Sequence, residues 1–413
     1  MTALSRRLFL QRGAIAGAAL GGGFLPGFAR RALAQGASGK VFVFLFLRGA
    51  LDGLSVVAPN GDGRLAQLRP QLTPPSGLLD GGVPGFALHP ALGPLLPLFR
   101  EGTLGFVHAV GSPDSTRSHF DAQDYLELGT PGVKSTPDGF LARAVGRTEA
   151  VASPVEAVAV TQHLPRSLQG DRGALAFASL EQLRLRPLAG GPGGARGRSV
   201  SRRAFETLYE GAADEPVGAS GKEAFAAVEL LERKLGEARL RGGEAGYPNG
   251  YLGQSMRLLA ALIKADVGLR VGFAEAGGWD THAAQPAVLE RNLGDLAKAL
   301  AAFRADLGAR FDDVLLVAAT EFGRTARQNG ALGTDHGHGS VAFYLGGAAN
   351  GGKVLGRWPG LADDQLFEGR DLAVTTDLRA VLGAALRSQL SGVDLARVFP
   401  GYGGPVLGNL TRV

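Results

Sequence analysis

The chain of 413 residues contains no cysteine. Disulfides, thiolate metal ligands and cysteine nucleophiles are therefore excluded, and any metal site must use His, Asp and Glu side chains. The sequence also lacks an uninterrupted apolar run of about 20 residues, so we expect no stable membrane span. A dinucleotide-binding glycine fingerprint is missing too, which leaves a redox enzyme with little support.

A basic surface is also lacking in the body of the chain. The net charge is +5, but residues 1–34 contain five arginines and no acidic residue. The charge of the remaining residues is therefore close to zero. We predict no binding to nucleic acid.

The first 34 residues have the pattern of an export signal. Residues 5–10 read SRRLFL, residues 13–28 are weakly apolar and rich in glycine, and Ala32 and Ala34 are small residues suited to cleavage. The pattern predicts a twin-arginine signal peptide that is cleaved after Ala34, with the twin-arginine translocase as partner and a periplasmic or secreted location. A short amphipathic helix is the alternative.

The rest of the chain, residues 35–413, alternates between strand-like and helix-like segments. Val41–Leu47 and Val314–Ala319 are continuous apolar runs, typical of strands buried on both faces, and Gln285–Leu307 has the apolar spacing of a helix. The alternation predicts one α/β domain with a mostly parallel central sheet and helices on both faces, interrupted by a helical insertion at about 180–265. Further strands are expected at 103–110, 155–160, 175–177, 269–275 and 340–345, and further helices at 89–100, 121–128, 222–241, 252–264 and 372–390.

Acidic and histidine residues follow several of these strands. The carboxyl ends of parallel strands meet at one edge of a sheet, where ligands bind. Asp280 and His282 are two residues apart, so in an extended turn their side chains point the same way. These positions predict a site for one or two divalent metal ions, for which zinc is the first expectation and manganese, iron, calcium and magnesium are alternatives. The candidate ligands are Asp52, Asp280, His282, Glu321, Asp335, His336 and His338.

Each candidate ligand also has a structural interpretation. Asp52 can form a turn, Asp280 can cap a helix, and Glu321 can pair with Arg324. Glycines surround Asp335, His336 and His338. We interpret these glycines as positions where the backbone approaches an ion closely. Which of the two histidines faces the metal is left open.

Several segments together resemble the domain-of-unknown-function family 1501, and they cover nearly the whole chain in order. The family comprises exported bacterial proteins related to the alkaline phosphatase and sulfatase superfamily. The resemblance implies a three-layer α/β/α sandwich that is alkaline-phosphatase-like. The segments read SRRLFL, FLRGALDGL, HPAL, GSPDSTRSHFDAQDYLELGTPG, GGWDTH, EFGRT, TDHGHGS and GRDLAVTTDLR.

The resemblance also implies roles for individual residues. Asp52 matches a metal-binding Asp after the first strand, and Asp280 with His282 resembles a pair that serves one metal. Glu321-Phe322 stands where the superfamily usually has an Asp-His pair. A further His follows downstream, which His336 or His338 would supply.

The turn from Ser115 to His119 resembles the place of a Ser or Thr nucleophile at a helix start. We favour Ser118, because Arg117 and His119 flank it, with Ser115 and Thr116 as alternatives. Arg117 would bind anionic oxygens of the substrate. Ser118 also fits a purely structural helix cap.

Together these features predict an exported metal-dependent hydrolase of phosphate or sulfate esters, in which Ser118, Arg117 and His119 act on an anionic ester substrate. The alternative is a non-catalytic exported binding or assembly protein that keeps the fold.

Overall fold

The computed structural model describes residues 39–72, 79–146, 155–171, 173–179 and 246–412, with isolated helical positions between 227 and 235. The predicted signal at 1–34 and much of the predicted insertion at 180–265 lie outside these residues. Within the described residues, no helix is long and apolar enough to cross a membrane.

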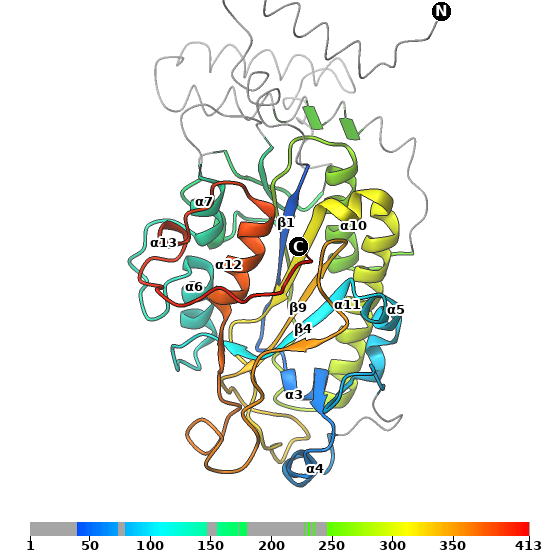
Figure 1. The fold of residues 1–413 in the computed structure, drawn as a ribbon, viewed down its shortest axis with the longest axis vertical. Helices are drawn as coiled ribbons and strands as arrows, with labels where there is room; N and C mark the ends of the chain where they lie inside the picture. The colour runs from blue at the N-terminus through cyan, green and yellow to red at the C-terminus, as the bar shows by residue number, and fades with distance from the viewer. Residues whose placement is uncertain are drawn as a thin grey trace, which may run out of the picture. The chain divides into compact units, whose positions relative to one another are not determined.

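A large central sheet organises the described part of the chain (Figure 1). Its strands follow the order β10-β4-β9-β8-β1-β7-β5-β6, and β11 pairs with β4. β9 is antiparallel to both of its neighbours, whereas the other strand pairs of this sheet are parallel. This confirms the predicted α/β fold with a mostly parallel sheet. The strands are β1 (Val41–Leu47), β4 (Leu104–Gly111), β5 (Ala157–Ala159), β6 (Leu175–Ala176), β7 (Val271–Ala276), β8 (Val314–Ala319), β9 (Ser340–Gly346), β10 (Val354–Leu355) and β11 (Thr376–Asp377).

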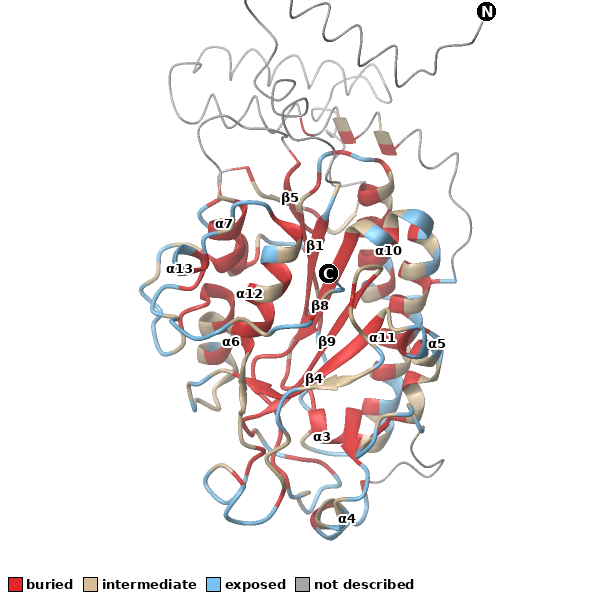
Figure 2. Cartoon of the chain, in the orientation of Figure 1, coloured by how far each residue is buried: buried red, intermediate tan, exposed pale blue. Residues whose placement is uncertain are grey.

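Strand β1 shows why helices cover both faces of the sheet. All seven of its residues are buried, and its side chains alternate between two cores. Val43 and Leu45 pack in the core that contains side chains of α10 (Tyr251–Lys264) and α11 (Gln285–Leu307). Phe44 and Phe46 pack in the core that contains side chains of α7 (Phe140–Val145) and α12 (Leu378–Gln389). Figure 2 shows the buried faces of these helices turned toward the sheet. α10 lies inside the predicted insertion but belongs to this core.

Shorter elements surround the sheet. A small antiparallel pair joins β2 (Val57–Pro59) and β3 (Phe86–Leu88). The remaining elements are α3 (Gly53–Val56), α4 (Gly63–Leu68), η1 (Pro90–Leu95), α5 (Leu96–Arg100), α6 (His119–Leu128), η2 (Arg166–Leu168), η4 (Gly308–Asp313) and α13 (Leu395–Val398).

The element boundaries agree closely with the sequence patterns for the most regular segments. β1, β8 and α11 begin and end at the predicted residues. α12 begins at Leu378 rather than Leu372, because Asp377 caps it by accepting the Arg379 N–H at 2.8 Å.

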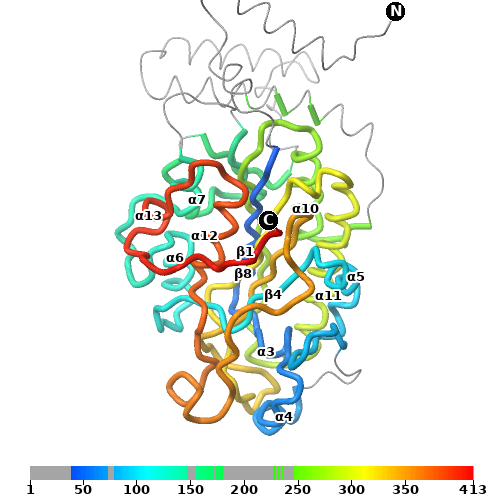
Figure 3. The backbone as a smooth tube through the Cα atoms, in the orientation of Figure 1, coloured from blue at the N-terminus to red at the C-terminus, as the bar shows by residue number. Residues whose placement is uncertain are grey.

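The direction of β9 determines which loops meet. β1, β4, β7 and β8 run the same way, so their carboxyl ends share one edge of the sheet. β9 runs in the opposite direction and therefore begins at that edge. The loop between β8 and β9 lies at the end of the sheet where α3 begins (Figure 3).

Candidate metal centre

Four side chains from two loops and one helix converge at this edge. His119 is the first residue of α6, Asp280 and His282 follow β7, and His336 precedes β9. One ligand atom from each of His119, Asp280 and His336 lies within 4.8 Å of the others. The His282 Nε2 atom lies 3.0 Å from Asp280 Oδ1 and 3.0 Å from His336 Nε2. We call these four residues the His/Asp cluster.

Two further contacts within the His/Asp cluster are of similar length. His336 Nε2 lies 3.3 Å from Asp280 Oδ1, and His119 Nε2 lies 3.6 Å from Asp280 Oδ2. Ligand atoms that bind one zinc ion at about 2.1 Å lie about 3.4 Å apart in a tetrahedral site. The spacing therefore fits a single ion.

Each histidine of the cluster uses its Nδ1 atom in a hydrogen bond that points away from the cluster. A carbonyl or an ionised carboxylate can only accept, so in the neutral tautomer with its proton on Nδ1 each ring keeps this bond and turns an unprotonated Nε2 toward the cluster. Metal-binding histidines typically have such outer acceptors. The acceptors are Glu321 Oε1 for His119 at 2.8 Å, Asp335 Oδ1 for His282 at 2.9 Å, and the Arg117 carbonyl for His336 at 2.7 Å.

Burial lowers the pKa of His336. The lowered pKa keeps the His336 imidazole neutral, which is the form that binds a metal. The pKa of His119 is raised, chiefly by its hydrogen bond to Glu321. The side chains of His282 and Asp280 are 45% and 43% exposed, so the cluster is open to solvent on this side.

Glu321 stands behind His119 rather than in the cluster. It is buried, and its carboxylate accepts hydrogen bonds from the Gly49 N–H at 2.9 Å, the Thr320 hydroxyl at 2.8 Å and the Gln123 amide at 2.9 Å, besides that from His119. Burial opposes ionisation, but hydrogen bonds from His119 and Gln123 outweigh it and lower the pKa of Glu321. The structure thus gives Glu321 the role of an ionised acceptor for His119.

Arg324 pairs with Asp280 rather than with Glu321. The buried Arg324 donates from Nη1 to Asp280 Oδ1 at 2.6 Å, and it also contacts the hydroxyl and carbonyl of Thr334. Burial opposes ionisation of Asp280, but Arg324 outweighs it and lowers the pKa of this carboxyl. Asp280 is thereby kept ionised, as a metal ligand must be.

The structure does not bring Asp52 into the His/Asp cluster. Asp52 is buried, and its carboxylate accepts from Arg69 Nη1 at 2.6 Å and Nη2 at 3.0 Å. Ser55 and Gln285 donate to the same carboxylate at 2.7 Å and 2.5 Å. Burial opposes ionisation, but Arg69 and these donors lower the pKa of Asp52. Its oxygens are committed to a buried ion pair that joins α3 and the loop around Arg69.

His338 and Asp335 also lie outside the cluster. The ring of His338 stacks on Phe367, with centroids 4.4 Å apart and planes inclined by 26°. Asp335 accepts from His282 and from Asn329. Of the two histidines that the sequence leaves open, the structure places His336 in the cluster.

The residues predicted to act on a substrate have other contacts. Ser118 caps α6, and its Oγ atom accepts a long hydrogen bond of 3.4 Å from the Asp121 N–H. The guanidinium of Arg117 is paired with Glu368 at 2.6 Å and Asp371 at 2.7 Å. His119, predicted to be catalytic, is brought into the cluster.

The glycines of this region serve contacts between loops. A Cβ atom at Gly333 would lie 2.3 Å from the backbone of His282, and one at Gly337 would lie 2.3 Å from the backbone of Arg324. Real atoms do not approach this closely, so only glycine fits. The glycines therefore allow backbone to approach backbone, between two loops at Gly333 and within the β8–β9 loop at Gly337.

The donor set indicates which metals fit. Three imidazole nitrogens and one carboxylate suit zinc, iron or manganese, whereas calcium and magnesium favour all-oxygen sites. The sequence analysis missed Gln123, Thr320 and Gly49, which orient Glu321. The signal for Gln123 was its position four residues after His119 on the same helix.

The chain belongs to the family described as "Protein of unknown function (DUF1501)", whose profile matches residues 103–398. This confirms the family resemblance. Among solved structures, the chain is similar to the lipoteichoic acid synthase LtaP from Listeria monocytogenes, with 10% identity and a TM-score of 0.34. That alignment covers 75% of this chain and 65% of the LtaP chain, so the chain spans less than two thirds of the length of LtaP. No curated protein matches the sequence.

Proposed function

We propose that this protein is an exported metal-dependent hydrolase of phosphate or sulfate esters. The supporting observation is the 3.0 Å approach of the His282 and His336 Nε2 atoms beside the Asp280 carboxylate. When both rings are protonated on Nδ1, the two Nε2 lone pairs repel each other, and a cation bound by both nitrogens removes that repulsion. A divalent ion bound there would polarise an ester oxygen and lower the pKa of an attacking hydroxyl or water.

The residues of the His/Asp cluster would hold this ion. Glu321, Asp335 and the Arg117 carbonyl orient the three imidazoles. Ser118 is the candidate nucleophile, because it directly precedes His119 at the amino end of α6, where the helix dipole favours an anion. The exposed side of the cluster leaves room for an ester to reach the metal. We also propose that the chain is related to the alkaline phosphatase and sulfatase superfamily.

The test uses protein that begins at Gln35, loaded with zinc or manganese. Metal content is measured by mass spectrometry, and turnover is measured with aryl phosphates and aryl sulfates. We expect one bound ion per chain, turnover of one ester class, and loss of turnover with retained metal in Ser118→Ala. Bound metal without turnover of any ester, or turnover that Ser118→Ala leaves unchanged, would contradict the proposal.

One observation favours the second candidate, a non-catalytic metal-binding protein. Arg117, the side chain predicted to hold the substrate anion, is neutralised by Glu368 and Asp371. If Arg117→Met and Ser118→Ala bind metal as the wild type does, and no ester is turned over by any of the three, the protein uses its metal for binding or assembly.

Export by the twin-arginine route is part of the proposal and rests on residues 1–34. A fusion of residues 1–38 to a reporter that folds in the cytoplasm tests it. We expect export of the fusion and its loss when Arg6 and Arg7 are both replaced by Lys. Export that persists in the double variant would exclude this route.

A further inference from the structure

Helix α6 presents three polar side chains at four-residue spacing on one face: His119, Gln123 and Glu127. His119 belongs to the His/Asp cluster, whereas Gln123 and Glu127 form hydrogen bonds with residues outside it. We propose that Gln123 is a positioning residue of the metal centre, and that Arg48 orients it. This inference rests on the metal site of the proposed function, but not on hydrolysis.

A continuous set of hydrogen bonds joins Arg48 to His119. Arg48 Nη1 donates to Gln123 Oε1 at 2.9 Å, and Gln123 Nε2 donates to Glu321 Oε1 at 2.9 Å. The same Glu321 oxygen lies 2.8 Å from His119 Nδ1. Gln123 is therefore the link between a cation remote from the cluster and the carboxylate that holds a cluster histidine.

The chemistry of the two neighbours permits only one orientation of the Gln123 amide. A guanidinium only donates hydrogen bonds, and an ionised carboxylate only accepts them. If the amide were turned over, its NH₂ group would face Arg48 and its oxygen would face Glu321, and both bonds would be lost. In the observed orientation the Gln123 NH₂ group donates to Glu321. The same ionised carboxylate oxygen accepts a second hydrogen bond, from His119 Nδ1.

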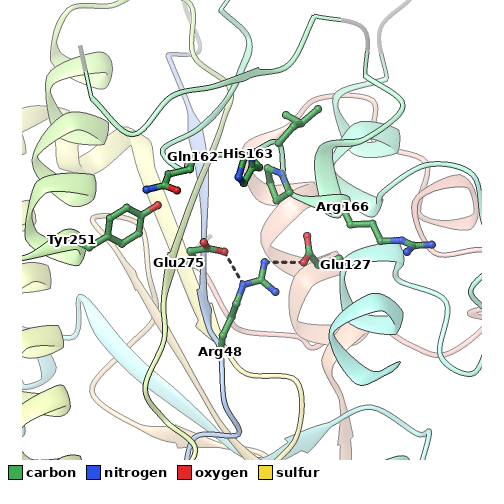
Figure 4. Close-up of a pocket in the computed structure, with 9 residues that line it drawn as sticks. Arg48, Glu127, Gln162, His163, Arg166, Tyr251 and Glu275 are labelled. Carbon is green, nitrogen blue, oxygen red and sulfur yellow. Dashed lines mark hydrogen bonds and ion pairs between the residues drawn. The ribbon is translucent and has the colours of Figure 1, made fainter. Parts of the chain in front are cut away.

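Arg48 is itself held firmly. It donates from Nε to Glu275 at 2.7 Å and from Nη2 to Glu127 at 2.8 Å. Figure 4 shows its guanidinium between these two carboxylates, on the wall of a cavity of about 400 Å³. The Arg48 guanidinium therefore bonds Glu275, Glu127 and Gln123 through three different nitrogens. A side chain without this planar group could not donate to all three partners.

The consequence concerns His119. Its Nε2 atom is buried and makes no hydrogen bond, so the Glu321 bond and the stacking of the ring on Phe322 orient it. Without Gln123, the Glu321 oxygen that receives His119 keeps the Gly49 N–H but loses its side-chain amide donor, so the carboxylate is held less firmly. His119 would then present its Nε2 lone pair to the metal in fewer molecules, and affinity would fall.

The test is a titration of metal-free protein, beginning at Gln35, with cobalt(II). Cobalt occupies zinc sites, and its visible absorption reports the ligand geometry. We expect Gln123→Met to raise the dissociation constant about tenfold, the lower end of the range for outer partners of metal ligands, and to change the cobalt spectrum. Gln123→Asn keeps the amide but is too short to reach both neighbours, so it should behave in the same way. Thermal unfolding identifies any variant that fails to fold.

A double-mutant cycle separates positioning from general stability. Arg48→Lys keeps the charge between Glu127 and Glu275 but cannot reach Gln123 as well. It should weaken cobalt binding about fivefold, less than the tenfold or more expected for outer partners of metal ligands, because Gln123 itself remains. In the Gln123→Met background it should have no further effect, because its influence passes through Gln123. The matched control is Asp124→Asn, one residue along α6, which pairs with Arg166 and Lys134 outside this network.

The outcomes distinguish the two proposals. Cobalt binding by the wild type that Gln123→Met and Gln123→Asn leave unchanged overturns the role of Gln123 alone. Additive effects of Arg48→Lys and Gln123→Met overturn the role of Arg48. A wild-type protein that binds no cobalt overturns the metal site and this inference together. Loss of ester turnover with cobalt binding intact bears only on the proposed hydrolysis.

Discussion

His336 and His338 are separated by a single glycine, yet their rings lie in different environments. His336 approaches His282 with its Nε2 atom 3.0 Å from that of its neighbour. His338 stacks on Phe367 and is buried among side chains remote from the metal ligands. Two histidines that look equivalent in the sequence are therefore distinguished by the path of the loop before β9.

This difference predicts opposite effects on metal binding. His336→Ala should raise the zinc dissociation constant at least about 100-fold, because it removes a ligand and leaves three. His338→Gln should leave zinc affinity within about twofold, since no ligand atom is changed, while lowering the melting temperature. Isothermal titration with zinc measures both, and equal losses in the two variants would refute the assignment.

The buried Asp52–Arg69 pair predicts an effect on stability without an effect on metal. Asp52→Asn leaves the Arg69 charge buried without its counter-charge, which costs about 3–5 kcal/mol. Urea unfolding should show this loss, and zinc affinity of the folded variant should be unchanged. Asp363→Asn is the control, because it breaks an exposed ion pair with Arg64 and should cost less than about 1 kcal/mol. If folded Asp52→Asn lost its zinc, Asp52 would have to be counted among the ligands.

Two glycines of the same loop provide a matched test of its packing. A Cβ atom at Gly333 would collide with the His282 backbone, whereas one at Gly330 meets nothing within 4 Å. Gly333→Ala should therefore displace His282, weaken zinc binding at least about tenfold and lower stability. Gly330→Ala should change neither property. A Gly333→Ala protein with wild-type zinc affinity would show that the loop tolerates the shift.

His108 predicts how stability depends on pH. It is buried on β4, where its Nε2 donates to the Val57 carbonyl at 2.8 Å and its Nδ1 accepts the Ala109 N–H. Burial lowers the pKa of His108 from 6.5 to about 4. Below pH 6.5 the unfolded chain binds a proton that the folded protein refuses, so the contribution is complete above pH 6.5 and is lost as the pH falls toward 4.

The lowered pKa of His108 should reduce the free energy of unfolding by about 3 kcal/mol between pH 7 and pH 4. Urea unfolding of the wild type and His108→Gln at pH 7 and pH 4 measures it, because the variant removes this titration and keeps a donor to Val57. The wild type should lose about 3 kcal/mol more than the variant over this range. Parallel losses would mean that another group carries the pH dependence.

The sequence by itself determined the regular framework. A strand made only of apolar residues buries all of its side chains only in the middle of a sheet that is covered on both faces. The bounds of β1 and β8 were therefore predicted to the residue. The long amphipathic pattern of α11 was a local signal of the same kind. The family motifs likewise supplied every residue of the His/Asp cluster as a candidate site residue, although His119 was predicted to be catalytic and not to bind metal.

Only the tertiary structure decided which candidates meet. Asp52 accepts hydrogen bonds from Arg69 and Gln285, and Glu321 accepts one from Gln123. His338 stacks on Phe367, and each of these partners lies at least 17 residues away along the chain. Chain spacing does not encode such contacts. The antiparallel direction of β9 completes the selection, because it starts the strand at the edge where the others end and so brings His336 to His282 and Asp280. A residue becomes a candidate metal ligand here because the packing around it turns its ligand atom toward the other members of the cluster, and that is a property of the folded protein.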